Sequence, residues 1–386
     1  MPGAENLVAA GLHVVGLSLV AMLGAGLLQL AVNRQANAAQ GHVIMAFVLA
    51  WLLMYGASVA YHLAPEGWWR ALLMALDRGA IFAVIAAGWA IIAPFRLPPV
   101  QAAWTVGILW ALALVGLAVE VAATWAGGGR ALRGFADAVY LTQAVAPLLI
   151  YGRGVFRTLS RPSLIYLFGG FVAYGIGFVF YRMPSDPWNH VYWHAMIIVG
   201  CLLNFGGVRQ LLRELQQSPA FHGPAASLAT TAAHRHAAMA MVLGYMAVSV
   251  PAHLAWEIAQ LPLYEIWVAG SVSDQIHAVL HGSMGDVMVA LLLLGAAILV
   301  LRAWRWPSAR FLPVVCAVTL IGIACTLFSE WLNVEWRGTW AYAAAMPRIP
   351  WLGTGVTPLL QWLLLPPLCL LVARRLVGRT ALFAAV

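Results

Sequence analysis

The chain has 386 residues, of which 63% are hydrophobic and only 9% are charged, and its formal net charge is +8. This balance excludes an ordinary soluble domain. All 21 basic residues are arginines, so a retinal Schiff base and any lysine nucleophile are excluded as well. Most arginines fall in predicted loops, where arginine sets membrane orientation, and we expect no nucleic acid as a partner.

Apolar runs of about 20 residues, the length that crosses a bilayer core, recur along the whole chain. They predict an all-α, polytopic membrane helical bundle with eleven spans, at residues 8–30, 43–63, 80–95, 102–125, 136–151, 164–181, 190–205, 237–261, 279–301, 311–331 and 356–377. The longest polar break separates seven spans from four. We therefore predict a seven-helix domain over residues 1–208, a polar linker over 209–236 and a four-helix membrane domain over 237–386.

Five polar residues of the first seven spans fall at span ends. Ser58 and His62 stand one turn apart near the end of the second span, Asp77 is expected to open the third, and His190 and His194 stand one turn apart at the start of the seventh. Even-numbered spans end, and odd-numbered spans begin, on the membrane face where the N-terminus lies. We therefore expect these five side chains to lie at the same depth in the membrane. A charge inside a membrane costs at least about 2.5–3.5 kcal/mol, so such a cluster predicts a function.

Three imidazoles with one open position are typical of a catalytic zinc site. In this interpretation His62, His190 and His194 bind Zn²⁺. Asp77 would take a proton from bound water or orient one histidine, and Ser58 would donate a hydrogen bond to the oxyanion or to the water. The spacing alone also allows interfacial histidines that bond lipid headgroups, with Ser58 bonded to its own backbone.

Several strings of the first half resemble hemolysin III. They are Glu5-Asn6 with His13 and Gly16, Ser58-x3-His62, Leu76-Asp77 with Ala80-Ile81, and Gly169-Gly170-x3-Tyr174-Gly175-Ile176-Gly177-x2-Phe180-Tyr181 leading into His190-x3-His194. The resemblance covers about residues 5–205, and the wider superfamily includes the progestin and adipoQ receptors and the alkaline ceramidases. The chain departs from the family at Arg78, where a histidine is usual, and at Ala86-Ala87-Gly88-Trp89, which lacks the usual threonine and tyrosine.

This resemblance implies a seven-helix fold with zinc held by His62, His190 and His194, and with Ser58 and Asp77 beside it. In relatives with known activity it implies hydrolysis of a lipid amide. We therefore favour a zinc-dependent hydrolase of a lipid amide or ester that acts in membrane lipid homeostasis. A non-enzymatic lipid or fatty-acid sensor with a structural zinc is the alternative, and a pore-forming haemolysin is a third. A membrane lipid is the expected substrate or ligand, and the bacterial cytoplasmic membrane is the expected location.

The last four spans carry a second polar set that the same alternation places on the N-terminal face. Its members are His253, Glu257, His277, His281, Asp286 and Glu330. Histidines and carboxylates one turn apart favour a second metal site, a proton-conducting or substrate-binding network, or a polar core that fixes helix register. A b-type haem is a weaker alternative, and the sequence assigns no activity to this domain.

Overall fold

The computed structural model describes residues 4–125, 130–183, 188–214, 226–350 and 352–383. These residues form helices without a strand, apart from the isolated bridges Tyr264–Tyr342 and Arg348–Gly355. The predicted all-α membrane bundle is therefore confirmed. The chain divides into two compact units, which we call the N-terminal unit (Val8–His236) and the C-terminal unit (Ala237–Val386, with Met1–Leu7).

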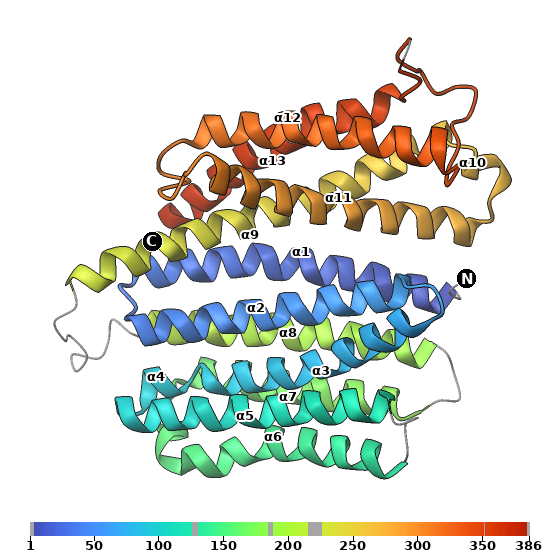
Figure 1. Cartoon of the computed structure of the whole chain (residues 1–386). Helices are drawn as coiled ribbons and strands as arrows, with labels where there is room; N and C mark the ends of the chain where they lie inside the picture. Colours follow the sequence, from blue (N-terminus) through green and yellow to red (C-terminus); the bar gives the residue numbers. More distant parts are fainter. Residues whose placement is uncertain (1–3, 126–129, 184–187, 215–225, 351, 384–386) are drawn as a thin grey trace. The chain divides into compact units, whose positions relative to one another are not determined.

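The N-terminal unit is an array of long helices joined by short connections, so that neighbours in sequence run antiparallel (Figure 1). Its helices are α1 (Ala4–Asn33), α2 (Ala38–Leu63), α3 (Trp68–Ala90), the short α4 (Ala93–Arg96), α5 (Pro99–Trp125), α6 (Arg130–Arg157), α7 (Arg161–Tyr181) and α8 (Trp188–Glu214). The most extensive packing is between α7 and α8, and α3 packs against both α2 and α5.

The C-terminal unit contains four long helices and several short ones. They are most of α9 (Ala226–Gln260), η3 (Leu261–Leu263), α10 (Ile266–Ala269), α11 (Val272–Val300), α12 (Phe311–Glu330), the π-helical turn η4 (Trp331–Trp336) and α13 (Val356–Phe383). Helix α12 packs between α11 and α13. The buried core of this unit includes Tyr245, Leu294, Val314, Trp362 and Leu370.

Ten helices of the described chain are long and apolar enough to span a membrane, with α4 continuing the third of them. The remaining predicted span, 136–151, lies inside α6. Side chains of helix α6 donate hydrogen bonds to backbone carbonyls of α3. The Tyr140 hydroxyl donates to Arg78 O at 2.8 Å, and the Gln143 amide donates to Phe82 O at 3.0 Å. Such interhelical hydrogen bonds stabilise packing where no water competes.

The helices extend beyond most of the predicted spans, and the difference matters at two places. Helix α3 begins at Trp68, so Asp77 lies more than two turns inside it and does not open it. The first turns were missed because Trp68 and Trp69 are exposed and precede Arg70, a composition that suits the membrane interface and not its core. Helices also occupy both ends of the predicted 209–236 linker, since α8 runs to Glu214 and α9 starts at Ala226.

Contacts at the end of helix α8 and along its first half fix its position within the N-terminal unit. Its last residue, Glu214, pairs with Arg96 and accepts a 2.7 Å hydrogen bond from Ser163 Oγ. Nearer its start, glycines let α7 approach closely: a Cβ on Gly200 would lie 2.0 Å from Tyr174 Cε1. Small residues at such crossings allow tight helix packing in membranes. The position of α8 matters because its first two turns carry His190 and His194.

Candidate metal centre

Four buried or half-buried histidines meet inside the N-terminal unit. His13 comes from α1, His62 from the last turn of α2, and His190 and His194 from the first turns of α8. His13, His62 and His194 are each no more than 5% exposed. One ring nitrogen from each of these three lies within 4.8 Å of the others. Among the described residues, this is the only group of histidines, cysteines and acidic residues that could hold a metal ion.

His194 occupies the middle of this group. Its Nδ1 lies 2.9 Å from His13 Nε2, and its Nε2 lies 2.9 Å from His190 Nε2. The ring centroid of His62 is 5.3 Å from that of His194, 5.6 Å from that of His190 and 5.8 Å from that of His13. The three predicted ligands therefore do come together, and His13 joins them as a fourth ring.

The predicted serine and aspartate lie beside the histidines. Ser58 is fully buried one turn before His62, and Asp77 is half-buried on α3. The Ser58 hydroxyl is close enough to the Asp77 carboxyl to interact with it, although within the described structure Ser58 Oγ forms no hydrogen bond of normal geometry. A polar hydroxyl left in this state inside a membrane protein indicates a missing partner, such as water or a ligand.

The donor set fits a metal ion. Neutral imidazole nitrogens are preferred ligands of zinc and of several transition metals. The Nδ1 atom of His13 is buried and has no hydrogen-bond partner among the described residues. We conclude that the cluster can hold a metal ion.

The sequence pattern around His13 does not indicate that this residue belongs to the centre. A lone histidine in an apolar helix is not paired with a second ligand at a helical spacing, so the pattern that indicates metal binding is missing. Helix alternation could have found it. Helix α1 begins on the membrane face where α2 ends and α8 begins. A histidine in the early turns of α1 therefore lies at about the same depth in the membrane as the histidines of α2 and α8.

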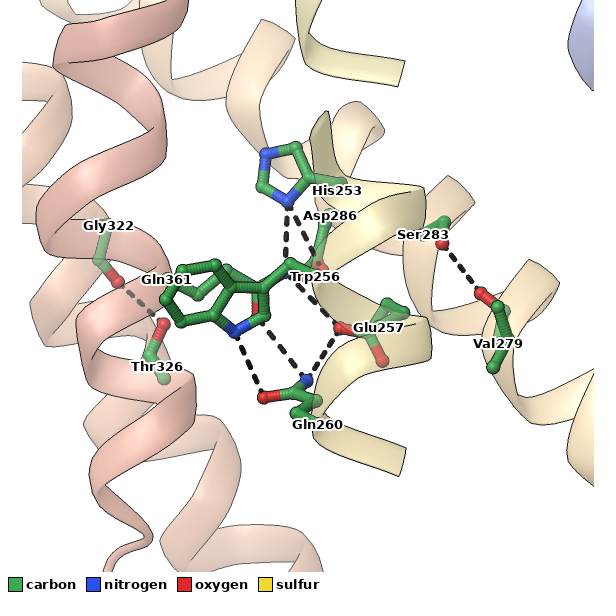
Figure 2. Close-up of polar contacts among 10 residues, drawn as sticks. All are labelled: His253, Trp256, Glu257, Gln260, Val279, Ser283, Asp286, Gly322, Thr326 and Gln361. Atoms are coloured by element: carbon green, nitrogen blue, oxygen red, sulfur yellow. Dashed lines mark hydrogen bonds and ion pairs between the residues drawn. The ribbon is translucent and has the colours of Figure 1, made fainter. Parts of the chain in front are cut away.

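The second predicted polar set is only partly assembled. His253, Glu257 and Asp286 meet in the C-terminal unit around the amide of Gln361, which sequence reasoning did not consider (Figure 2). Glu330 lies at the end of α12, where it hydrogen-bonds the Tyr342 hydroxyl.

The other two histidines of that set do not join the network. The rings of His277 and His281 lie 5.8 Å apart on α11, and no described contact links either of them to His253, Glu257 or Asp286. His281 is exposed. Among the described residues this region holds no metal-binding cluster of histidines and acids, and two adjacent imidazoles on one helix are too few ligands for a zinc site.

Comparison with known proteins covers the N-terminal unit. A family model described as haemolysin-III related matches residues 4–205. The "Hemolysin-3 homolog" of Bacillus subtilis (strain 168) is 26% identical over 164 residues, which are 41% of this chain and 72% of that protein. The "Hemolysin-3" of Bacillus cereus is 25% identical over 158 residues, 40% of this chain and 67% of that protein.

No solved structure matches the chain. The family match ends before α9, so it covers none of residues 237–386. Within the matched region lie all four histidines of the metal centre, together with Ser58 and Asp77. The protein is an integral, multi-pass membrane protein that belongs to the haemolysin-III related family.

Proposed function

We propose that the N-terminal unit is a zinc-dependent hydrolase that cleaves an amide or ester bond of a membrane lipid in the bacterial cytoplasmic membrane. The observation that carries the proposal is the meeting of four imidazoles from three helices beside a buried hydroxyl and a carboxyl. A structural zinc would close with four protein ligands, whereas three ligands leave a position for water or substrate.

His62, His190 and His194 are the proposed ligands. If the Nε2 atom of His194 faces the ion beside His190, its Nδ1 is left to carry the hydrogen and donates it to His13 Nε2, 2.9 Å away. Ligand histidines usually donate their second nitrogen in this way, which fixes the ring orientation and the tautomer. His13 is then the residue that orients His194.

Zinc, when bound, supplies a Lewis acid that polarises a carbonyl oxygen and acidifies water. Asp77 is proposed to accept a proton from the attacking water, because its carboxyl lies on the neighbouring helix beside Ser58. The Ser58 hydroxyl, which lacks a hydrogen bond of normal geometry among the described residues, is proposed to donate to the developing oxyanion.

A small cavity of about 30 Å³ with a mostly apolar lining also lies within this unit, with room for a water-sized group but not for a lipid chain. Its lining comes from α2, α3, α7 and α8 and includes Phe47, Ile91, Ile92, Leu167, Val208 and Leu211. Asn204, another lining residue, lies ten positions beyond His194 on α8, or about 15 Å at 1.5 Å per residue. The cavity thus lies along α8 at some distance from the metal centre.

The test begins with metal analysis of the purified full-length protein by mass spectrometry. The protein is then mixed with N-acyl amide and ester lipids in micelles, and released fatty acid is measured. We expect one zinc per chain and fatty-acid release that Asp77→Asn abolishes without lowering zinc content. The exposed His42 provides the control, and His42→Ala should retain both properties.

A non-enzymatic sensor with a structural zinc predicts a different result. In that case zinc would be bound, no lipid would be cleaved, and lipid would still raise the thermal stability of Asp77→Asn. Absence of zinc and of any other transition metal would refute both functions.

A further inference from the structure

One face of α9 carries a polar residue at every turn through the interior of the C-terminal unit. Tyr245, Ser249, His253 and Glu257 follow one another at intervals of four residues. The first three are no more than 1% exposed. The line extends over twelve residues, about 18 Å of helix. Ionisable residues buried in membrane helices commonly mark ion or proton pathways.

At one end of this line two carboxyls compete for the same hydrogens. Gln361 Nε2 lies 2.7 Å from Asp286 Oδ2, 3.2 Å from Glu257 Oε1 and 3.0 Å from His253 Nδ1, as Figure 2 shows. An amide nitrogen has only two hydrogens. The three acceptors therefore fit this geometry best when one of them carries a proton of its own.

The charges lead to the same conclusion. Glu257 and Asp286 interact directly, and among the described residues no arginine forms an ion pair or hydrogen bond with either of them. Two ionised carboxylates would place two negative charges side by side inside the membrane. Neighbouring carboxyls in such a site share a proton. Within the described part of the chain, the basic group paired with them is His253, whose Nδ1 lies 3.4 Å from Asp286 Oδ2.

His253 connects the carboxyls to the rest of the line. Because Gln361 donates to its Nδ1, the neutral ring carries its hydrogen on Nε2, and Figure 2 shows this nitrogen turned away from the carboxyls. His253 Nε2, Ser249 Oγ and Tyr245 Oη are all buried, and none has a hydrogen-bond partner of normal geometry among the described residues. Ser249 nevertheless interacts with both Tyr245 and the Cys369 thiol. Three such atoms in succession indicate positions for water or for a moving proton.

Beyond the carboxyls, the line continues towards the connection between α12 and α13. Glu330 interacts electrostatically with Asp286 and accepts a hydrogen bond from Tyr342. Burial, followed by the bond to Glu330, raises the pKa of Tyr342 above its ordinary value, so its hydroxyl stays protonated. Burial and the nearby acids also raise the pKa of Tyr264. The groups facing the carboxyl pair are thus His253, Glu330, Tyr264, Gln361 and Gln260.

We propose that the C-terminal unit binds a proton at the Glu257–Asp286 pair and passes protons along α9 through His253, Ser249 and Tyr245. In the step at the histidine, a proton leaves the Asp286 carboxyl for His253 Nδ1, and the ring releases its Nε2 proton towards Ser249. The carboxyl becomes a carboxylate, and the imidazole ends neutral as its other tautomer. Proton uptake at the pair restores the carboxyl group, and a flip of the His253 ring, which turns its protonated nitrogen towards Ser249, prepares the next transfer.

Proton flux through the full-length protein in liposomes tests the proposal. Vesicles that contain a pH-sensitive dye and potassium are diluted into sodium-free buffer, and valinomycin then sets a membrane potential that drives protons inward. Wild-type protein should acidify the interior faster than protein-free vesicles do. Glu257→Gln should reduce the rate to that of protein-free vesicles, because it removes the exchangeable proton but keeps the size of the side chain.

Two further variants keep the result interpretable. Glu265→Gln removes an exposed carboxyl from the same unit and should leave the flux unchanged. Tyr245→Phe removes only a hydroxyl far from the carboxyls and should slow the flux severalfold. Wild-type flux no faster than protein-free vesicles, flux that requires sodium, or equal flux in Glu257→Gln and Glu265→Gln would each overturn the proposal.

Discussion

The two polar centres of this protein are assembled from different chemical groups. The centre of the N-terminal unit consists of four imidazoles, whose ring nitrogens contact one another. In the C-terminal unit the Gln361 amide bridges two carboxyls, and the Gln260 amide donates to one of them as well. Imidazole nitrogens facing one another favour a cation between them, whereas carboxyls already supplied with amide hydrogens require only one additional proton.

This difference explains why similar sequence spacings lead to different centres. Both units contain pairs of ionisable residues one turn apart, including His190 with His194 and His253 with Glu257. What distinguishes them is the neighbouring helix. Helices α1 and α2 bring further histidines to the first pair, while α13 brings Gln361 to the second.

The largest effect should come from removing the central histidine. His194→Ala takes away a proposed ligand and the contacts to both His13 and His190. We expect zinc content to fall to the background level and the melting temperature to decrease, because metal binding contributes directly to folding. Metal analysis and thermal unfolding measure the two effects. Unchanged zinc in His194→Ala, compared with the His42→Ala control, would contradict the ligand assignment.

A second pair of variants separates a ligand from a residue that orients a ligand. His190→Gln should abolish zinc binding, whereas His13→Gln should weaken it by about 10–100-fold, the usual effect of losing a partner of a ligand histidine. Competition with a zinc chelator gives the affinities. The reverse order would make His13 the third ligand, in agreement with its position within 4.8 Å of His62 and His194 nitrogens.

The placement of α8 can be disturbed without touching any histidine. Gly200→Ala would put a Cβ 2.0 Å from Tyr174 Cε1 and should destabilise the N-terminal unit by about 1–3 kcal/mol through overpacking. Gly175 on α7 has open space around it, so Gly175→Ala should be neutral or stabilising by up to about 1 kcal/mol. Thermal unfolding of both variants with and without added zinc provides the comparison. Equal stability of the two would refute the close contact.

The smallest effect should come from the packing of the second centre. A Cβ on Gly282 would lie 3.0 Å from Glu257 Oε2, whereas a Cβ on Gly285 would meet nothing within 4 Å. Gly285→Ala should gain up to about 1 kcal/mol from helix propensity alone. Gly282→Ala should gain less, because the Glu257 carboxyl must shift by a few tenths of an ångström. A larger gain for Gly282→Ala in thermal unfolding would show that Glu257 does not pack there.

Much of the fold was predictable because the bilayer leaves few choices. A spanning segment must satisfy its own backbone hydrogen bonds, so long apolar runs become helices. The apolar runs did not predict where the helices begin and end. The first turns of α3 are rich in tryptophan and polar enough to resemble a loop, and α8 continues past residue 208 because Glu214 is paired with Arg96 and Ser163. Boundary residues are decided by such tertiary contacts.

The residues of the two polar centres could be predicted only where their spacing on one helix places them next to each other. Pairs on one helix, such as His190 with His194, were found from the sequence and are in contact. His277 and His281 have the same spacing but do not join the carboxyl network, because spacing does not tell which way a helix face is turned. Gln361 could not be recognised, since an amide has no ionisable group and acquires its role from α9 and α11.

The long sequence separation within the metal centre also has a consequence for how the protein is made. His13 and His194 are 181 residues apart, yet their rings are in contact. During synthesis the first histidines enter the bilayer well before the ribosome has translated α8. A metal ion that binds through His194 can therefore enter the centre only once α8 is in place, which would make metal loading a late step of assembly.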